Sequence, residues 1–379
     1  MTSKSFRLYL AVAFWLLTAA TVSISLTSEP VDWQKARELR RREQQGQTLT
    51  DEERAYLQRA KQEYAKQKQP AQAQPARETT GLIPLTELGD GLYKGQTGGL
   101  YGHGLNVPPE SQRKAAQTQT ALIVPRDATG NPSDAGKVVL ISLGMSNTTQ
   151  EFSVFKTRAE ADPNKSSKLV IVDCAQGGQA AYQWAYPQPT NSGRTPWDVM
   201  DQRILAARVT ALQVQVVWLK QAEIGPAKLG EFPSHAQTLR NNIAIILRQL
   251  KTRFPNLAIA YLSSRIYAGY AATQLNPEPY AYESAFSVRW LIEAQMTNDP
   301  NLNYDPLQGE VKAPLLLWGP YLWGDGIKPR QSDGLVWARA DLGPDGTHPS
   351  TTGRQKVADL LLTFFKTDEN ARQWFVKPK

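Results

Sequence analysis

Four short polar segments of the chain carry side chains that could together perform one reaction. They are residues 144–147, 175–179, 220–223 and 345–349. The first segment supplies a hydroxyl group, and the second and third supply glycine backbone N–H groups and a side-chain amide. The fourth supplies a carboxylate and an imidazole. Acyl transfer by a serine nucleophile requires this combination of groups.

The hydroxyl, imidazole and carboxylate groups belong to Ser146, His348 and Asp345. A serine hydroxyl is a weak nucleophile until a base removes its proton, and a histidine with a pKa of about 6.5 is such a base at neutral pH. Asp345 lies three residues before His348, so the pair can be arranged locally, and a carboxylate orients the imidazole. We therefore predict Ser146 as nucleophile, His348 as base and Asp345 as the orienting group.

An acyl-transfer site also needs hydrogen-bond donors that hold the oxyanion of the tetrahedral intermediate. The predicted donors are the backbone N–H of Ser146, a backbone N–H at Gly177 or Gly178, and the side-chain amide of Gln221. Each segment alone also fits a structural role, because Ser146 suits the start of a helix and two glycines suit a turn. The four segments in this order favour the catalytic interpretation.

Five short apolar runs alternate with helical patterns and would position these segments. The runs cover residues 137–143, 168–174, 214–219, 257–263 and 314–318. Nearly continuous apolar strands indicate a parallel sheet buried on both faces. Helical patterns cover residues 235–254 and 351–365, so we expect an α/β three-layer fold. The polar segments should then meet at the carboxyl edge of the sheet, where such folds bind ligands.

With these segments the chain resembles the SGNH (GDSL-type) hydrolases, which are α/β esterases with an Asp-x-x-His pair near the C-terminus. It is most similar to the sialate O-acetylesterase-like carbohydrate esterase branch. That branch has Gly-Gln-Ser-Asn at the nucleophile, where this chain has Gly-Met-Ser-Asn at residues 144–147, and a Gly-Gly turn followed by a tryptophan, here Trp184. The resemblance covers about residues 135–366, and its most specific part is Asp345-x-x-His348. It implies a flavodoxin-like three-layer sandwich with a five-stranded, mainly parallel sheet.

The chain departs from this family pattern at three places. Met145 replaces the usual polar residue beside the nucleophile. The family's Trp-x-Gln-Gly-Glu segment matches only in part, because Ala222 replaces the glycine and Trp218 is one residue further away. The family's third block, which contains an asparagine, is absent, so the oxyanion role of Gln221 is an inference. Loss of one oxyanion donor lowers the rate by about 100- to 1000-fold.

Polar and aromatic side chains near the predicted strand ends are candidates for substrate contact. We predict such contacts for Asn147, Glu223, Arg265, Tyr267 and Trp323. Aromatic rings beside a cleft suit stacking on sugar rings, and packing in the core is the alternative for any one of them. Arg265 could pair with Glu283 or bind an acidic substrate, and the sequence leaves both open.

Composition argues against several other functions. The chain has 43 Lys and Arg against 35 Asp and Glu, a formal net charge of +8, but the basic residues form no block of the kind that binds nucleic acid. One Cys and three His exclude a disulfide framework and a zinc site with several thiolate ligands. We expect no metal, no organic cofactor and no nucleic-acid partner.

The N-terminal part is predicted to export or tether the protein. Lys4 and Arg7 precede an apolar run at residues 8–26, so residues 1–26 fit a signal peptide or a membrane anchor. Residues 27–66 are predicted to form a charged helical hairpin, 67–80 a flexible linker and 81–379 the esterase domain. The expected location is extracytoplasmic, either secreted or periplasmic, or membrane-anchored through residues 8–26.

These observations predict an extracytoplasmic serine esterase that removes acetyl or similar short acyl groups from a carbohydrate. Two alternatives remain. An O-acyltransferase acting on a cell-envelope polysaccharide would use the same triad and fits a membrane tether. A non-catalytic glycan-binding module on the same fold fits the departures at Met145 and Ala222.

Overall fold

The computed structural model describes residues 31–44, 49–67, 76–190 and 192–378. The predicted leader at residues 1–26 lies outside these ranges, and so do residues 68–75 of the predicted linker. The chain divides into two compact units, Met1–Gln69 and Pro70–Lys379. Within the described ranges, no helix combines the length and the apolar character that crossing a bilayer requires.

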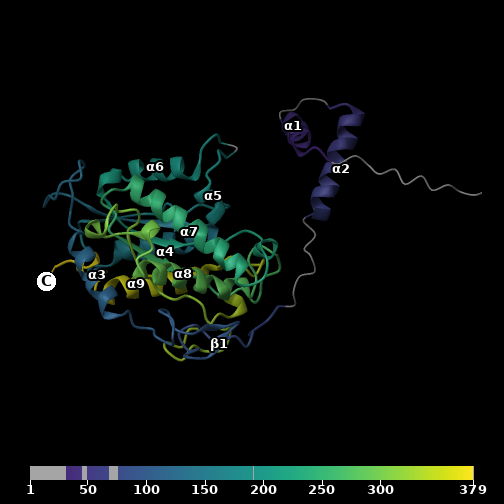
Figure 1. Cartoon of the computed structure of the whole chain (residues 1–379). Coiled ribbons are helices and arrows are strands. Elements are labelled where there is room, and N and C mark those ends of the chain that lie inside the picture. The colour runs from purple at the N-terminus through teal and green to yellow at the C-terminus, as the bar shows by residue number, and fades with distance from the viewer. Residues whose placement is uncertain (1–30, 45–48, 68–75, 191, 379) are drawn as a thin grey trace, which may run out of the picture. The chain divides into compact units, whose positions relative to one another are not determined.

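The first unit contains two helices that pack against each other, α1 (Trp33–Gln44) and α2 (Asp51–Gln67) (Figure 1). Leu39, Leu49 and Leu57 are buried together between them. Thr50 and Glu53 form a capping box at the start of α2, since Thr50 Oγ1 accepts from the Glu53 N–H (3.2 Å) and Glu53 Oε2 accepts from the Thr50 N–H (3.0 Å). This reciprocal pair satisfies two backbone donors that a helix start would leave free.

The second unit is built on a five-stranded parallel sheet in the order β4-β3-β5-β6-β7. The strands are β3 (Val138–Gly144), β4 (Leu169–Val172), β5 (Val214–Lys220), β6 (Ile259–Ser263) and β7 (Leu315–Trp318). Nearly every residue of the five strands is buried, because helices cover both faces. The predicted α/β three-layer sandwich with a five-stranded parallel sheet is therefore confirmed.

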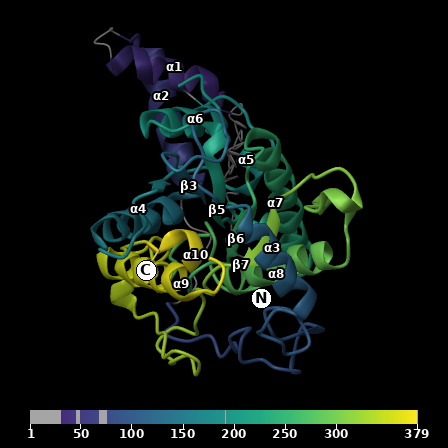
Figure 2. The same cartoon turned by 90° about the vertical axis from the view of Figure 1, so that its left-hand side faces the viewer.

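The helices form the outer layers of this unit. Two of them, α4 (Ser146–Ala161) and α9 (Thr351–Thr367), pack against each other on one face of the sheet, while α6 (Pro196–Ala206), α7 (Ser234–Arg253) and α8 (Tyr280–Met296) lie on the other face (Figure 2). This placement follows from right-handed crossovers between parallel strands. The shorter helices are α3 (Glu110–Ala121), α5 (Ala181–Ala185) and α10 (Arg372–Phe375).

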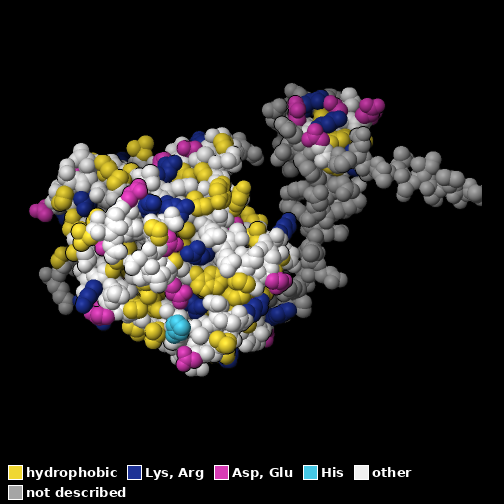
Figure 3. All heavy atoms as spheres, in the orientation of Figure 1, with side chains coloured by type: hydrophobic (Ala, Val, Ile, Leu, Met, Phe, Trp, Pro, Cys, Tyr) yellow, Lys and Arg dark blue, Asp and Glu magenta, His cyan; other side chains and the backbone are white. Residues whose placement is uncertain are grey.

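Short elements complete the unit. A two-stranded antiparallel hairpin joins β1 (Leu92–Tyr93) and β2 (Gln96–Thr97). The 3₁₀ helices are η1 (Ala211–Gln213), η2 (Pro226–Leu229), η3 (Pro300–Leu302), η4 (Pro306–Gln308) and η5 (Arg339–Asp341). On the face of this unit shown in Figure 3, acidic and basic side chains are interspersed.

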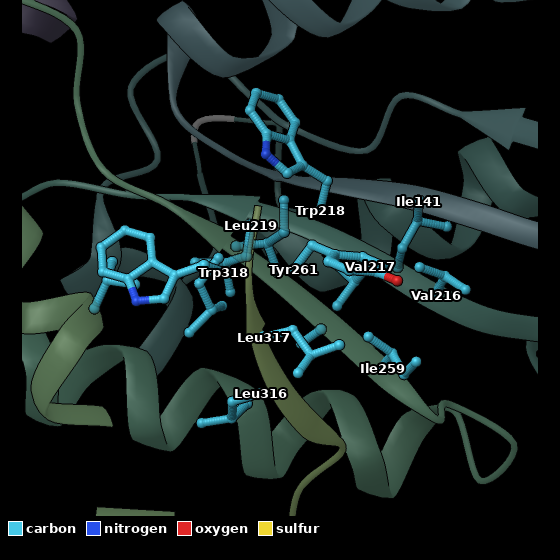
Figure 4. Packing of buried hydrophobic residues seen from close by; sticks show 14 of the residues in the cluster. Ile141, Val216, Val217, Trp218, Leu219, Ile259, Tyr261, Leu316, Leu317 and Trp318 are labelled. Atoms are coloured by element: carbon cyan, nitrogen blue, oxygen red, sulfur yellow. The ribbon is translucent and has the colours of Figure 1, made fainter. Parts of the chain in front are cut away.

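The core lies between the sheet and its helices. Trp218, Tyr261 and Leu317 are register neighbours on β5, β6 and β7, and their side chains are buried there (Figure 4). Both predicted helical patterns are present, because residues 235–254 coincide with α7 and residues 351–365 with α9. The apolar positions of these two helices face the sheet and bury their side chains.

The structure differs from the prediction at the C-terminal end of the linker, residues 67–80. The Arg77 N–H donates to the Gly269 carbonyl (2.9 Å), and the Glu78 carbonyl accepts from the Ile327 N–H (3.0 Å). Thr80 donates its N–H and its hydroxyl to Asp325 Oδ1, at 2.7 and 2.6 Å. Residues 77–80 are thus part of the α/β unit. Their polar composition suggested a linker, but partners far away in sequence satisfy their backbone groups.

Candidate active site

Ser146 stands at the carboxyl edge of the sheet because β3 ends at Gly144 and α4 begins at Ser146. A Cβ atom at Gly144 would overlap the Thr148 hydroxyl and the Lys220 carbonyl, so the chain needs glycine here. The Thr148 hydroxyl donates to that carbonyl (2.8 Å) and ties the first turn of α4 to the end of β5. Ser146 is therefore held at a sharp strand-to-helix turn, and its side chain is partly exposed.

The structure brings the three predicted triad residues together. Ser146 Oγ lies 2.7 Å from His348 Nε2, and His348 Nδ1 lies 2.5 Å from Asp345 Oδ2. Asp345 Oδ1 accepts the backbone N–H groups of Thr347 and His348, both at 3.0 Å. Partial burial raises the pKa of Asp345, but these hydrogen bonds outweigh it and hold the pKa below its usual value. Asp345 is thus an ionised, backbone-fixed partner for the imidazole.

Asn147 fastens the histidine loop to α4. Its side-chain Nδ2 donates to the Thr347 carbonyl (2.9 Å), and the residue is 1% exposed. We predicted a substrate contact for Asn147, but its buried amide is used within the protein. Its role in this structure is to position the residue before His348 opposite Ser146.

The Gly177–Gly178 turn lies directly beside Ser146. A Cβ atom on Gly177 would be 3.8 Å from the Cβ of Ser146. The turn is fixed from the preceding residue, because the Gln176 N–H donates to the Gly144 carbonyl (3.0 Å) and its Nε2 donates to the Pro196 carbonyl (2.8 Å). Gly178 has a φ of +76°, a conformation that glycine adopts without strain. Both glycines are exposed, so their backbone can be approached by a substrate.

Gln221 connects the second and third polar segments. Its side-chain Nε2 donates to the Gln179 carbonyl (3.3 Å), and its Oε1 accepts from the Ala222 N–H (3.2 Å). A primary amide carries two N–H groups, and the bond to Gln179 uses one of them. Gln221 is 2% exposed, so its orientation is set by the protein. The predicted oxyanion role of this amide stays a prediction.

The two residues that depart from the family pattern belong to one small apolar cluster. Met145 and Ala222 are buried with Ala180, and the Ala222 carbonyl accepts from the Ala181 N–H (3.0 Å). An apolar side chain at position 145 therefore suits an apolar neighbour at position 222. The cluster joins the ends of β3 and β5 to the start of α5.

Glu223 has a structural environment. Its Oε1 accepts from Asn242 Nδ2 (2.8 Å) and its Oε2 from the Tyr182 N–H (3.3 Å), while its carbonyl accepts from Asn276 Nδ2 (3.3 Å). Burial raises the pKa of Glu223 above its usual value. We predicted a substrate contact, but the residue is 6% exposed and instead links β5 to α5 and α7. Only the fold reveals Asn242 as its partner.

Tyr267 and Trp323 are also part of the interior. Both are 0% exposed. The Tyr267 hydroxyl donates to the Arg77 carbonyl (2.7 Å), and Trp323 Nε1 donates to Glu278 Oε1 (2.8 Å). The predicted substrate contacts at these two positions are therefore corrected. Both rings pack in the core and are inaccessible to a sugar.

A buried charge cluster missed by the sequence analysis links α4, the helix that begins at Ser146, to the end of β5. Lys220, the last residue of β5, forms an ion pair with Glu151 on α4, and both side chains are at most 1% exposed. Burial lowers the pKa of Lys220 to about 8 and raises the pKa of Glu151. Arg265 is 2% exposed and interacts electrostatically with Glu151 and Asp345. The prediction that Arg265 contacts substrate is therefore corrected, because its side chain is buried. Glu283, the other partner considered for Arg265, pairs with His235 and Lys94 instead.

In the part of the chain that the structure describes, no three His, Cys, Asp or Glu side chains come together in a way that would hold a metal ion.

No family model matches the chain, and no curated protein matches it. Three solved structures are similar to part of the chain. A Bacillus subtilis protein is 12% identical with a TM-score of 0.32, and the match covers 61% of this chain and 56% of that one. An extracellular lipase from Streptomyces rimosus is 12% identical (TM-score 0.30; 60% of this chain, 99% of that one). A gut microbial diltiazem-metabolizing enzyme is 14% identical (TM-score 0.32; 60% of this chain, 46% of that one).

Proposed function

We propose that the protein is a serine esterase of the SGNH type that cleaves short acyl esters. The observation that carries this proposal is the continuous hydrogen-bonded chain from Ser146 Oγ through the His348 ring to Asp345. Nucleophile, base and orienting carboxylate are recognised by this geometry and not by their order in a sequence. A partly exposed hydroxyl at the carboxyl edge of a parallel sheet is accessible to substrate.

In the first half of the reaction, Ser146 Oγ attacks the ester carbonyl carbon while His348 Nε2 takes the hydroxyl proton. The Asp345 carboxylate stabilises the resulting imidazolium through Nδ1. When the tetrahedral intermediate collapses, the ester C–O bond breaks and His348 gives its proton to the leaving alcohol. In the second half, His348 removes a proton from water, water attacks the acyl-serine, and the acid leaves as Ser146 recovers its proton.

The oxyanion is proposed to bind between three donors. The Ser146 N–H lies at the N-terminus of α4, where backbone N–H groups have no partner within the helix. The Gly177–Gly178 turn lies against Ser146, and the Gln221 amide comes from the neighbouring strand end. Donors held by the fold before the reaction begins stabilise the developing charge most effectively.

The proposed substrate is an O-acetylated carbohydrate outside the cytoplasm. The resemblance of the nucleophile, Gly-Gly and Asp-x-x-His segments to carbohydrate esterases supports the substrate class. The basic and apolar residues of the predicted leader support export or anchoring. The leader itself lies outside the residues that the structure describes.

The proposal is tested by hydrolysis of p-nitrophenyl acetate by the full chain. We expect Ser146→Ala and His348→Ala each to lower kcat by at least about 1000-fold, as loss of a triad member does. Matched controls are Ser332→Ala and His103→Asn, which change exposed residues and should keep kcat within about twofold. Full activity in Ser146→Ala would refute the assignment. Acetyl transfer to an added sugar in preference to water would identify an O-acyltransferase instead.

A further inference from the structure

We propose that Tyr182 and Tyr186 form an aromatic platform that binds a sugar ring of the substrate next to the ester. This inference rests on the proposed esterase function and names the part of the site that would recognise carbohydrate. It replaces the buried rings of Tyr267 and Trp323, which the sequence suggested for that role.

The aromatic side chains of both residues are exposed to solvent. Tyr182 is 54% exposed and Tyr186 is 47% exposed. Among the residues whose side chains are described, these are the only exposed Phe, Tyr or Trp side chains. Large exposed apolar side chains grouped on one surface commonly mark a binding site.

The platform stands close to the nucleophile. Ala180 is buried together with Met145, the residue before Ser146, and Tyr182 is only two residues after Ala180. Two residues span at most about 7 Å of chain. Tyr182 therefore lies next to the apolar cluster that supports the nucleophile and within reach of a sugar whose acyl group occupies the site.

The two rings lie together on one side of α5. Their centroids are 5.1 Å apart with an interplanar angle of 43°. Tyr182 lies within α5, and Tyr186 directly follows its last residue. Trp184, between them in sequence, is 0% exposed and packs edge-on against Trp197 with centroids 4.9 Å apart. The short helix thus has a core side anchored by Trp184 and a solvent side formed by the tyrosines.

The backbone beneath the platform is fixed to the oxyanion segments. The Tyr182 N–H donates to Glu223 Oε2 (3.3 Å), and Glu223 is held in turn by Asn242 (2.8 Å). The Ala181 N–H donates to the Ala222 carbonyl (3.0 Å), and the Tyr186 N–H donates to the Tyr182 carbonyl (2.9 Å). A rigid support keeps the distance between the rings and Ser146 constant, which lowers the entropy lost on binding.

The exposure of the rings favours a sugar over a long acyl chain. A sugar ring has an apolar C–H face, which can stack on a tyrosine, and hydroxyl groups at its rim, which remain in water. A hydrocarbon chain gains most in an enclosed apolar site, whereas these rings are about half exposed. Tyrosine also offers a hydroxyl group for hydrogen bonding at the ring edge.

The test measures binding separately from catalysis. Peracetylated cellobiose is titrated calorimetrically into the full-length Ser146→Ala protein, which cannot turn it over if the proposed mechanism holds. We expect the added Tyr182→Ala and Tyr186→Ala changes to weaken binding about tenfold together, which is the size expected for two aromatic stacking contacts. Tyr182→Phe should restore most of the lost affinity. Leu307→Ala, a 93% exposed residue before β7, controls for removal of an exposed apolar side chain and should have no effect.

A parallel measurement separates this inference from the proposed function. In the protein with Ser146 intact, Tyr182→Ala should raise KM for the sugar ester by a larger factor than KM for p-nitrophenyl acetate, since the second ester has no sugar ring to stack. The platform proposal would be overturned if the platform variants bound the disaccharide as tightly as the Ser146→Ala protein does. It would also be overturned if the Ser146→Ala protein did not bind the disaccharide. Absence of p-nitrophenyl acetate hydrolysis with binding retained would overturn the esterase and keep the platform.

Discussion

The Oγ atom of Ser146 and the Nε2 atom of His348 lie 2.7 Å apart although the two residues are 202 positions apart in the chain. Ser146 follows strand β3, and His348 lies in the loop before α9. The contact between α4 and α9 on one face of the sheet brings the two segments together. Asn147 closes the same junction through the Thr347 carbonyl (2.9 Å).

Replacement of Asp345 by Asn should leave the loop folded and remove most activity. Asn keeps an oxygen for the backbone N–H groups of Thr347 and His348, but its amide favours the wrong tautomer of the imidazole. We expect kcat for p-nitrophenyl acetate to fall about 10⁴-fold with the melting temperature little changed. Asp134→Asn, at an exposed position, is the control. Activity within tenfold of the unaltered protein would exclude Asp345 as the orienting group.

Replacement of Gln221 by Ala tests the third oxyanion donor. If the amide stabilises the oxyanion, kcat should fall about 100- to 1000-fold with little change in KM, because the interaction forms only in the transition state. The exposed Gln188→Ala serves as the matched control. An unchanged kcat in Gln221→Ala would assign the amide to its structural bond with the Gln179 carbonyl (3.3 Å).

The buried pair of Lys220 and Glu151 should be sensitive to loss of one partner. Glu151→Gln leaves the Lys220 ammonium group buried without a countercharge, so we expect the free energy of unfolding in urea to fall by about 3–5 kcal/mol. The double change Glu151→Leu and Lys220→Met removes both charges and should be less destabilising than the single change. If Glu151→Gln were as stable as the unaltered protein, the Lys220 ammonium group would not require the Glu151 carboxylate as its countercharge.

Glu278 should make stability depend on pH. Burial raises its pKa to about 7, in spite of the hydrogen bonds it accepts from Trp323 and from two backbone N–H groups. The folded pKa is above the unfolded value, so its contribution is fully present below about pH 4.5 and is lost as pH rises through about 7. Between these pH values we expect a loss of about 1–3 kcal/mol.

The measurement for Glu278 is urea unfolding from pH 5 to 8, compared with Glu278→Gln. The variant cannot ionise at this position. Its unfolding free energy should therefore increase relative to that of the unaltered protein as pH rises. A difference that is constant over this range would show that Glu278 does not titrate there.

The sequence alone determined the architecture and the local half of the proposed triad. Nearly continuous apolar strands indicate two buried faces, and helical periodicity places α7 and α9 correctly, because local patterns record which faces are buried. Asp345 and His348 are three residues apart, so their pairing is a local property. The order of the polar segments at strand ends then identified Ser146 as their partner.

Tertiary structure decided which side chains face solvent. Tyr267, Trp323, Arg265 and Glu223 have residue types suited to substrate binding, but each is at most 6% exposed. Lys220 directly follows the apolar run 214–219 in the sequence, yet it is the last residue of β5 and is buried against Glu151 on α4. Tyr182 and Tyr186 carry no sequence signal that separates them from buried tyrosines. Exposure depends on what packs on a residue from distant segments, and only the assembled layers contain that information.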